Sequence, residues 1–155
     1  MDIVIRKATV EDLPAVQKLG TELMLSEIQF DLYLDKDWYA NKYGAAYLLK
    51  EIKGRNHICF VAEAGDQLVG YASCKVLPKD TSRPMKRAEL DNLVVSEKYR
   101  GHGVGHKLVA AFKQWAKTKQ ATKVKVIVNA HNAPGIHFYE NNGFKDHHLV
   151  MEADL

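Results

Sequence analysis

The chain has 155 residues, of which 46% are hydrophobic and 26% charged, and its formal net charge at pH 7 is +3. These values indicate a single globular domain over residues 1–155 and exclude disordered, collagen-like and low-complexity proteins. No apolar run approaches the roughly 20 residues of a membrane span, and the first residues lack the pattern of a signal peptide. We therefore expect a cytoplasmic protein without a membrane partner.

The first half of the chain predicts a strand, two helices and a hairpin. Residues 2–8 alternate as a strand does. Apolar residues then recur at helical spacing from about residue 10 into the twenties, and again over 38–52. Residues 57–77 contain two apolar runs separated by the turn dipeptide Gly65-Asp66, which predicts a β-hairpin with antiparallel strands.

The two cysteines, Cys59 and Cys74, fall on the two strands of this hairpin. As diagonal neighbours they would form only a strained disulfide. We expect reduced, partly buried thiols, as is usual in the cytoplasm.

The second half alternates strands with helices. Strands are expected at 88–95 and 123–128, helices at 105–119 and 134–142, and a closing strand at 144–153. The whole order predicts a mixed α/β (α+β) protein with a central, mostly antiparallel sheet flanked by about four helices.

A glycine-rich turn precedes the helix at 105–119. Residues 100–105 read Arg-Gly-His-Gly-Val-Gly directly after an apolar strand. Glycine lets the backbone approach a ligand closely, and the free N–H groups of a first helical turn bind phosphate. The spacing departs from the Walker A loop and from the Gly-x-Gly-x-x-Gly dinucleotide motif. A glycine-rich helix start without any ligand is the alternative.

This turn, Arg-x-x-Gly-x-Gly after an apolar strand, resembles the pyrophosphate-binding motif of the GNAT N-acetyltransferase superfamily. Downstream, Asn132 and the run Phe-Tyr-Glu-Asn-Asn-Gly-Phe at 138–144 are similar to a second signature of that family. Both stand in the family's order, and the resemblance covers nearly the whole chain. It implies a GNAT-like acyl-CoA N-acyltransferase fold that moves the acetyl group of acetyl-CoA to an amine without a metal.

The resemblance also assigns the acetyl-CoA contacts. Backbone amides of the turn would hold the pyrophosphate, and the end of the preceding strand, where the family's strands splay apart, would pair with the pantetheine. The residues so assigned are Leu93, Val94, Val95, Arg100, Gly101, His102, Gly103, Val104, Gly105, His106, Asn132 and Tyr139. Core packing is the alternative for Leu93 and Val95, and helix capping is the alternative for Asn132.

The resemblance implies that Tyr139 is the general acid. A phenol with the ordinary pKa of about 10 is protonated at neutral pH and can donate its proton to the departing CoA thiolate. An aromatic core position is the alternative reading of Tyr139.

The base is expected at Glu89 or Asp91, acting directly or through water. These residues lie two apart on one strand and so share a face, which we also expect to carry Leu93 and Val95. The alternatives are solvated or ion-paired acids, and a reaction without a dedicated base.

The segment from 27 to 47 mixes acids with aromatic residues, a composition that suits a cationic amine. We expect the acceptor to contact Phe30, Asp31 and Tyr33. A small polyamine-, aminoglycoside- or amino-acid-like amine is the expected substrate; a protein N-terminus or lysine is the alternative. Acidic solvent-facing and aromatic core-facing helix surfaces would give the same composition.

Four further expectations concern the alternative function, the partners and the metal. A catalytically silent acyl-CoA sensor on the same fold is the runner-up to the enzyme. No nucleic-acid partner is expected, because the basic residues are spread over the chain. The resemblance allows a homodimer joined through the C-terminal strand. His102 and His106 have a spacing that suits a metal, but no third ligand is near, so no metal is expected.

Overall fold

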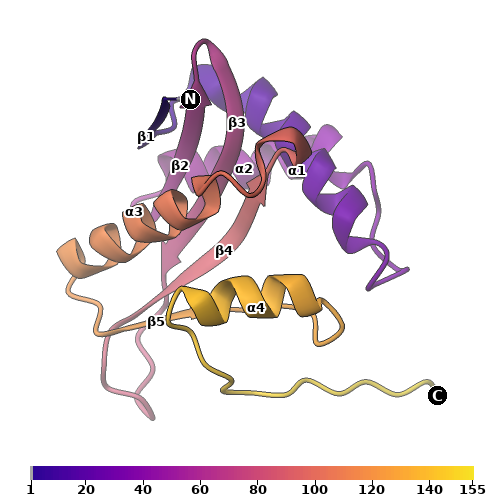
Figure 1. Ribbon diagram of the computed structural model, residues 1–155. Helices are drawn as coiled ribbons and strands as arrows, with labels where there is room; N and C mark the ends of the chain where they lie inside the picture. Colours follow the sequence, from indigo (N-terminus) through magenta and orange to yellow (C-terminus); the bar gives the residue numbers. More distant parts are fainter. Residues whose placement is uncertain (1) are drawn as a thin grey trace.

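A five-stranded sheet forms the centre of the computed structural model, which describes residues 2–155 (Figure 1). Its strands are, in spatial and chain order, β1 (Ile3–Lys7), β2 (His57–Ala64), β3 (Gln67–Val76), β4 (Arg87–Val95) and β5 (Lys123–Val126). Neighbours from β1 to β4 are antiparallel, and β4 pairs with β5 in parallel. The predicted mixed, mostly antiparallel sheet is therefore confirmed.

Four α-helices cover the sheet, as predicted. They are α1 (Leu13–Glu27), α2 (Lys42–Lys53), α3 (Val104–Thr118) and α4 (Ala133–Asn141). Short 3₁₀ turns lie at η1 (Val10–Asp12), η2 (Trp38–Ala40) and η3 (Glu97–Tyr99). Asparagines begin two of the helices: Asn41 accepts the amides of residues 43 and 44, and Asn132 accepts that of residue 135.

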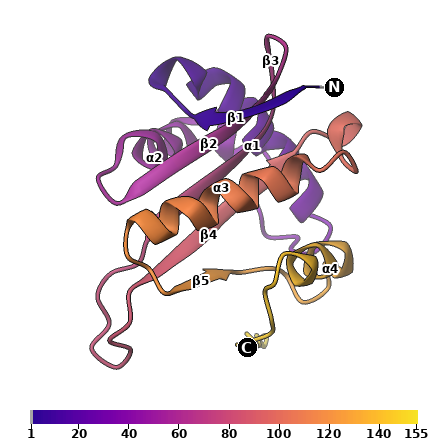
Figure 2. The same ribbon diagram turned by 60° about the vertical axis from the view of Figure 1, so that its left-hand side comes forward.

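Two hydrophobic cores lie on opposite faces of the sheet. One joins α1 and α2 to the sheet, with Leu48 fully buried, and the other packs α3 on the opposite face through Leu108 and Phe112 (Figure 2). Both core layers follow from the helical spacing of apolar residues seen in the sequence.

The cysteines are not diagonal neighbours on one face, so that expectation was wrong. Cys59 lies opposite Ser73 on β3, and the next residue, Cys74, points to the other face, because side chains alternate along a strand. The two thiols accordingly belong to different cores. Both are buried and free, and burial raises the pKa of Cys59 to about 12.

The closing strand predicted at 144–153 is absent from the structure of residues 2–155. After α4 the chain runs as an extended segment away from the sheet (Figure 1). Leu149, Val150 and Met151 are 73–83% exposed. An extended segment becomes a strand only where a partner backbone lies alongside it, and local alternation carries no information about that partner. We call residues 145–155 the C-terminal arm.

Candidate active site

The glycine-rich turn begins α3 in the geometry expected for binding an anion. Gly101 and Gly103 have φ values of +76° and +78°, a conformation that strains other residues. Among residues 2–155 no side chain caps the first turn of α3, and no acid lies in that turn, so its N–H groups remain free with their partial positive charge. The side chain of Arg100 donates to the carbonyl of Val95 at 2.9 Å and ties the turn to the end of β4.

The remaining turn residues have separate roles. The Val104 side chain is buried, which leaves only its backbone to face a ligand. The exposed His102 contacts the carbonyl of Arg100 at 2.8 Å, and the exposed His106 contacts the amide oxygen of Asn142 at 3.0 Å. Within residues 2–155 no three His, Cys, Asp or Glu side chains are grouped closely enough to hold a metal ion.

The two sequence motifs meet at the start of α3. A Cβ at Gly105 would lie 3.0 Å from the ring of Phe138, so glycine permits α4 to pack closely there. His106 lies on the same ring, with 5.2 Å between centroids. The glycine-rich turn and the helix that carries Tyr139 therefore form one unit.

Strands β4 and β5 separate beside this unit. Their pairing ends at Leu90 and Val126, although β4 continues to Val95. From Asp91 onward β4 has, in the described part of the chain, a partner strand only on the β3 side. Leu93, Val94 and Val95 thus lie along an unpaired edge.

A β-bulge on β4 changes which side chains share a face. Cys74 lies opposite Leu90 and Ser73 lies opposite Asn92, so Asp91 has no residue opposite it. The extra residue turns Asp91 and Asn92 to the α2 side together. Leu93 and Val95 pack instead in the α3 core. Placing them on the face of Glu89 and Asp91 was wrong, because simple alternation ignores the bulge.

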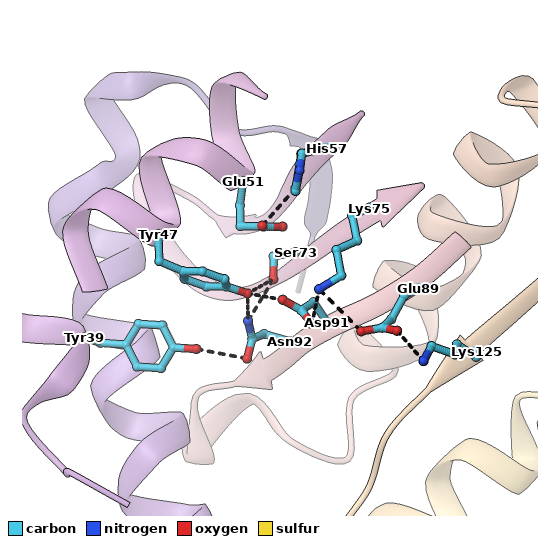
Figure 3. Close-up of polar contacts among 10 residues, drawn as sticks. All are labelled: Tyr39, Tyr47, Glu51, His57, Ser73, Lys75, Glu89, Asp91, Asn92 and Lys125. Atoms are coloured by element: carbon cyan, nitrogen blue, oxygen red, sulfur yellow. Dashed lines mark hydrogen bonds and ion pairs between the residues drawn. The ribbon is translucent and has the colours of Figure 1, made fainter. Parts of the chain in front are cut away.

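Both acids proposed as bases are paired with lysines (Figure 3). Lys75 Nζ lies 2.9 Å from Asp91 and 3.5 Å from Glu89, and Lys125 Nζ lies 2.8 Å from Glu89. The acids do share a face, as predicted. Burial raises the pKa of Asp91, but hydrogen bonds from Tyr47 and Lys75 outweigh it and leave the pKa below 3.8.

Side chains on the α2 side of the bulge form a polar network that the sequence analysis did not predict. Tyr47 donates to Asp91, and the Asn92 amide donates to Tyr47 at 2.6 Å and to Ser73 at 2.9 Å. Tyr39 donates to the Asn92 oxygen at 3.0 Å. An Asp-Asn pair inside an apolar strand was the only available signal, since the tyrosines come from distant segments (Figure 3).

The network leads to a prediction about stability. Asp91→Asn is expected to lower the free energy of unfolding at pH 7 by about 1–2 kcal/mol, because Lys75 loses a charged hydrogen-bond partner. The lowered pKa means that this stabilisation is present above pH 3.8 and is lost as the pH falls through the folded pKa. Denaturant unfolding at pH 7 and pH 3 should show the larger difference at pH 7. Equal free energies of unfolding for Asp91→Asn and wild type at pH 7 would contradict this prediction. Asp66→Asn, in the hairpin turn, is the control and should match wild type.

Tyr139 is partly buried between two aromatic rings. Its ring centroid lies 5.2 Å from that of Phe138 and 5.7 Å from that of Phe144. Burial, together with the nearby charge of Glu27, raises the pKa of Tyr139 to about 12. The phenol therefore stays protonated across the neutral range.

Asn132 caps α4, which was the alternative to a pantetheine contact in the sequence analysis. Its Oδ1 accepts the amide of Gly135 at 2.9 Å, and its Nδ2 lies 3.5 Å from Glu27. Nearby, Asn129 contacts the carbonyl of Phe30 at 3.4 Å, which joins the end of α1 to the loop before α4.

The three residues proposed for the acceptor lie on the loop after α1. Phe30 is partly buried, whereas Asp31 is exposed and Tyr33 is 92% exposed. Asp31 accepts the amide of Tyr33 at 3.1 Å and so shapes the loop. The structure thus brings Phe30 toward α4 and leaves Asp31 and Tyr33 at the surface.

No helix within residues 2–155 is long and apolar enough to cross a membrane.

Known proteins resemble this chain in sequence and structure. Residues 17–144 match the acetyltransferase (GNAT) family. An uncharacterized N-acetyltransferase of Methanocaldococcus jannaschii is 28% identical over 127 residues, which are 80% of this chain and 56% of that protein. The chain thus spans about half the length of this curated relative.

Two solved structures illustrate the common fold. The BH1408 protein of Bacillus halodurans superposes with a TM-score of 0.87 at 20% identity, over 98% of this chain and 99% of that one. An aminoglycoside N-acetyltransferase solved with CoA superposes with a TM-score of 0.75 at 18% identity, over 99% and 95% of the two chains.

Proposed function

The chain belongs to the acetyltransferase (GNAT) family, and from this premise we propose that it transfers the acetyl group of acetyl-CoA to a primary amine of a small molecule. The observation that carries the proposal is the junction of the uncapped start of α3, the unpaired end of β4 and the helix that bears Tyr139. These residues suit acetyl-CoA: free amides for its pyrophosphate, strand backbone for its pantetheine, and a phenol for its sulfur.

Acetyl-CoA supplies an activated thioester carbonyl as substrate. We propose that the amides from Gly101 to Gly105 bind the pyrophosphate, with Arg100 and His106 beside them. The backbone of Leu93 to Val95 pairs with the pantetheine, and Asn132 lies near it. This arrangement aims the thioester into the opening between β4 and β5.

The proposed chemistry is direct attack by the amine. The amine nitrogen forms a bond to the acetyl carbon, and the bond from that carbon to sulfur breaks. Tyr139 donates its proton to the departing thiolate and regains one from solvent. The amine proton passes to a base, for which Glu89 and Asp91 are the sequence-based candidates, directly or through water.

The proposed acceptor is a polyamine-, aminoglycoside- or amino-acid-like amine that contacts Phe30, Asp31 and Tyr33. The aminoglycoside acceptor of the CoA-bound fold neighbour supports this class. The free thiols Cys59 and Cys74 fit the proposed cytoplasmic setting.

Thermal unfolding tests the proposal first. Acetyl-CoA and CoA at about 100 times their Kd should stabilise the protein by about 2.7 kcal/mol, whereas NAD and ATP should not. Thiol release from acetyl-CoA should then follow addition of a primary amine. Absence of any shift with acetyl-CoA would refute the proposal. A shift without turnover of small amines or of lysine peptides would instead identify an acyl-CoA sensor.

We also propose that the protein forms a homodimer, in which the C-terminal arm of one copy pairs with the outer edge of β5 in the other. Within residues 2–155 that edge has no partner strand, and an open edge is a site for pairing with another chain. The arm carries Glu152 and Asp154, which complement Lys123 and Lys125 on β5.

Sedimentation tests the dimer. Val150→Asp is expected to shift the protein from dimer to monomer, because a buried charge would stand among the arm's apolar residues. Leu32→Asp changes an equally exposed apolar residue on the loop after α1 and should remain dimeric. A monomeric wild type, or a dimeric Val150→Asp variant, would contradict the proposal.

A further inference from the structure

A third carboxylate lies closer to Tyr139 than its sequence position indicates. Glu27 is the last residue of α1, and its Oε1 lies 3.5 Å from the Nδ2 of Asn132, the residue that caps α4. In both ribbon views the end of α1 comes close to α4 (Figures 1 and 2). Tyr139 lies on the helix that Asn132 caps, and burial together with the charge of Glu27 raises the pKa of Tyr139.

Glu27 differs from Glu89 and Asp91 in its surroundings. Those two acids are held by Lys75 and Lys125, whereas no Lys, Arg or His side chain in residues 2–155 lies within ion-pair distance of Glu27. The Glu27 side chain is half-buried, and burial raises its pKa. Because the contact with Asn132 is at the limit of hydrogen bonding, a partly desolvated carboxylate is left without a cation of its own.

A cationic ligand would supply that missing partner. The proposed acceptor is an ammonium ion in solution, and it must lose a proton before its nitrogen can attack. The Glu27 carboxylate stands at the end of α1, against the residue that caps the helix of the proposed acid Tyr139. The contact from Asn129 to the carbonyl of Phe30 holds the end of α1 against this region.

We propose that Glu27 binds the ammonium group of the acceptor and accepts the proton that the amine loses. One nitrogen–hydrogen bond of the ammonium ion breaks toward a Glu27 oxygen, and the electron pair left on nitrogen forms the bond to the acetyl carbon. The carbon–sulfur bond then breaks, and the thiolate takes the Tyr139 proton. The second proton that the nitrogen then loses passes through water to the Tyr139 phenolate, which has given its own proton to the thiolate. This inference rests on the proposed acetyl transfer, and it leaves Glu89 and Asp91 in their ion pairs with lysines.

The test compares Glu27→Gln with wild type over pH 5–10, with spermidine, sisomicin and lysine as acceptors. Gln keeps the size of the side chain and an oxygen for Asn132. We expect kcat to fall about 10²-fold, as for loss of a general base. We also expect KM for the amine to rise and the acidic limb of the kcat/KM profile to move to higher pH, because without Glu27 only amine that is already neutral in solution can attack. The thermal shift with acetyl-CoA should be unchanged.

Two variants make the test specific. Glu22→Gln changes an acid on the same helix that lines a separate cavity with Arg6 and Asp12, and it should behave as wild type. Glu27→Asp keeps the charge and should retain more activity than Glu27→Gln. If Asp and Gln at 27 lose activity equally, the carboxylate charge is not the cause and the inference fails.

The outcomes distinguish a failure of the Glu27 inference from a failure of the acetyltransferase proposal. If wild type acetylates an amine and Glu27→Gln keeps its kcat, KM and acidic limb, the Glu27 inference is overturned and the acetyltransferase proposal stands. If wild type binds acetyl-CoA but acetylates no amine, both are overturned.

Discussion

Replacing Tyr139 with Phe is expected to lower kcat for acetyl transfer about 10²-fold, the typical loss on removing a general acid. Phe keeps the aromatic packing against Phe138 and Phe144, so the fold and KM for acetyl-CoA should change little. Because the pKa of Tyr139 is raised to about 12, deprotonation of this residue should not reduce the wild-type rate below pH 10.

Steady-state thiol release from pH 6 to pH 10 measures this effect. Tyr43→Phe removes a phenol from an exposed position of α2 and serves as the control. An undiminished kcat in Tyr139→Phe would mean that water protonates the thiolate and that Tyr139 is an aromatic core residue.

Gly103→Val should abolish the stabilisation by acetyl-CoA. A β-branched residue at φ +78° is strained, and relief of that strain would reorient the amides at the start of α3. The strain should lower the free energy of unfolding of this variant by about 1–2 kcal/mol. It should also lose the stabilisation of about 2.7 kcal/mol that wild type gains at 100 times Kd.

Gly65→Val is the control that distinguishes the effect of backbone strain on stability from a loss of acetyl-CoA binding. Gly65 has φ +59° in the hairpin turn, and at both glycines an added Cβ meets nothing within 4 Å. The two variants should therefore lose similar stability without ligand. Only Gly65→Val should keep the shift with acetyl-CoA; a full shift in Gly103→Val would show that the turn does not bind the pyrophosphate.

The local patterns in the chain determine most of the fold. Helical spacing located α1 to α3, Pro134 and Gly143 located α4, the Gly65-Asp66 dipeptide located the hairpin, and the glycines of 101–105 required the turn that starts α3. These features depend on a residue's own conformational preference or on its neighbours a few positions away. They can be recognised without knowing which distant segments meet.

Tertiary structure alone decided the features that depend on distant partners. The bulge at Asp91 results from the register between β3 and β4, so alternation along one strand could not show that Leu93 faces the α3 core. The C-terminal arm had the composition of a strand, but it forms no strand pairing within residues 2–155.

Dependence on distant residues also explains why the three carboxylates Glu27, Glu89 and Asp91 differ in their surroundings. From sequence, Glu89 and Asp91 stood out because they alternate on one strand, and Glu27 was one acid among several on a loop. Folding pairs the first two with lysines and brings Glu27 to Asn132, 105 positions along the chain. Charge and burial of a side chain are set by residues remote in sequence, and only the assembled fold brings those residues together.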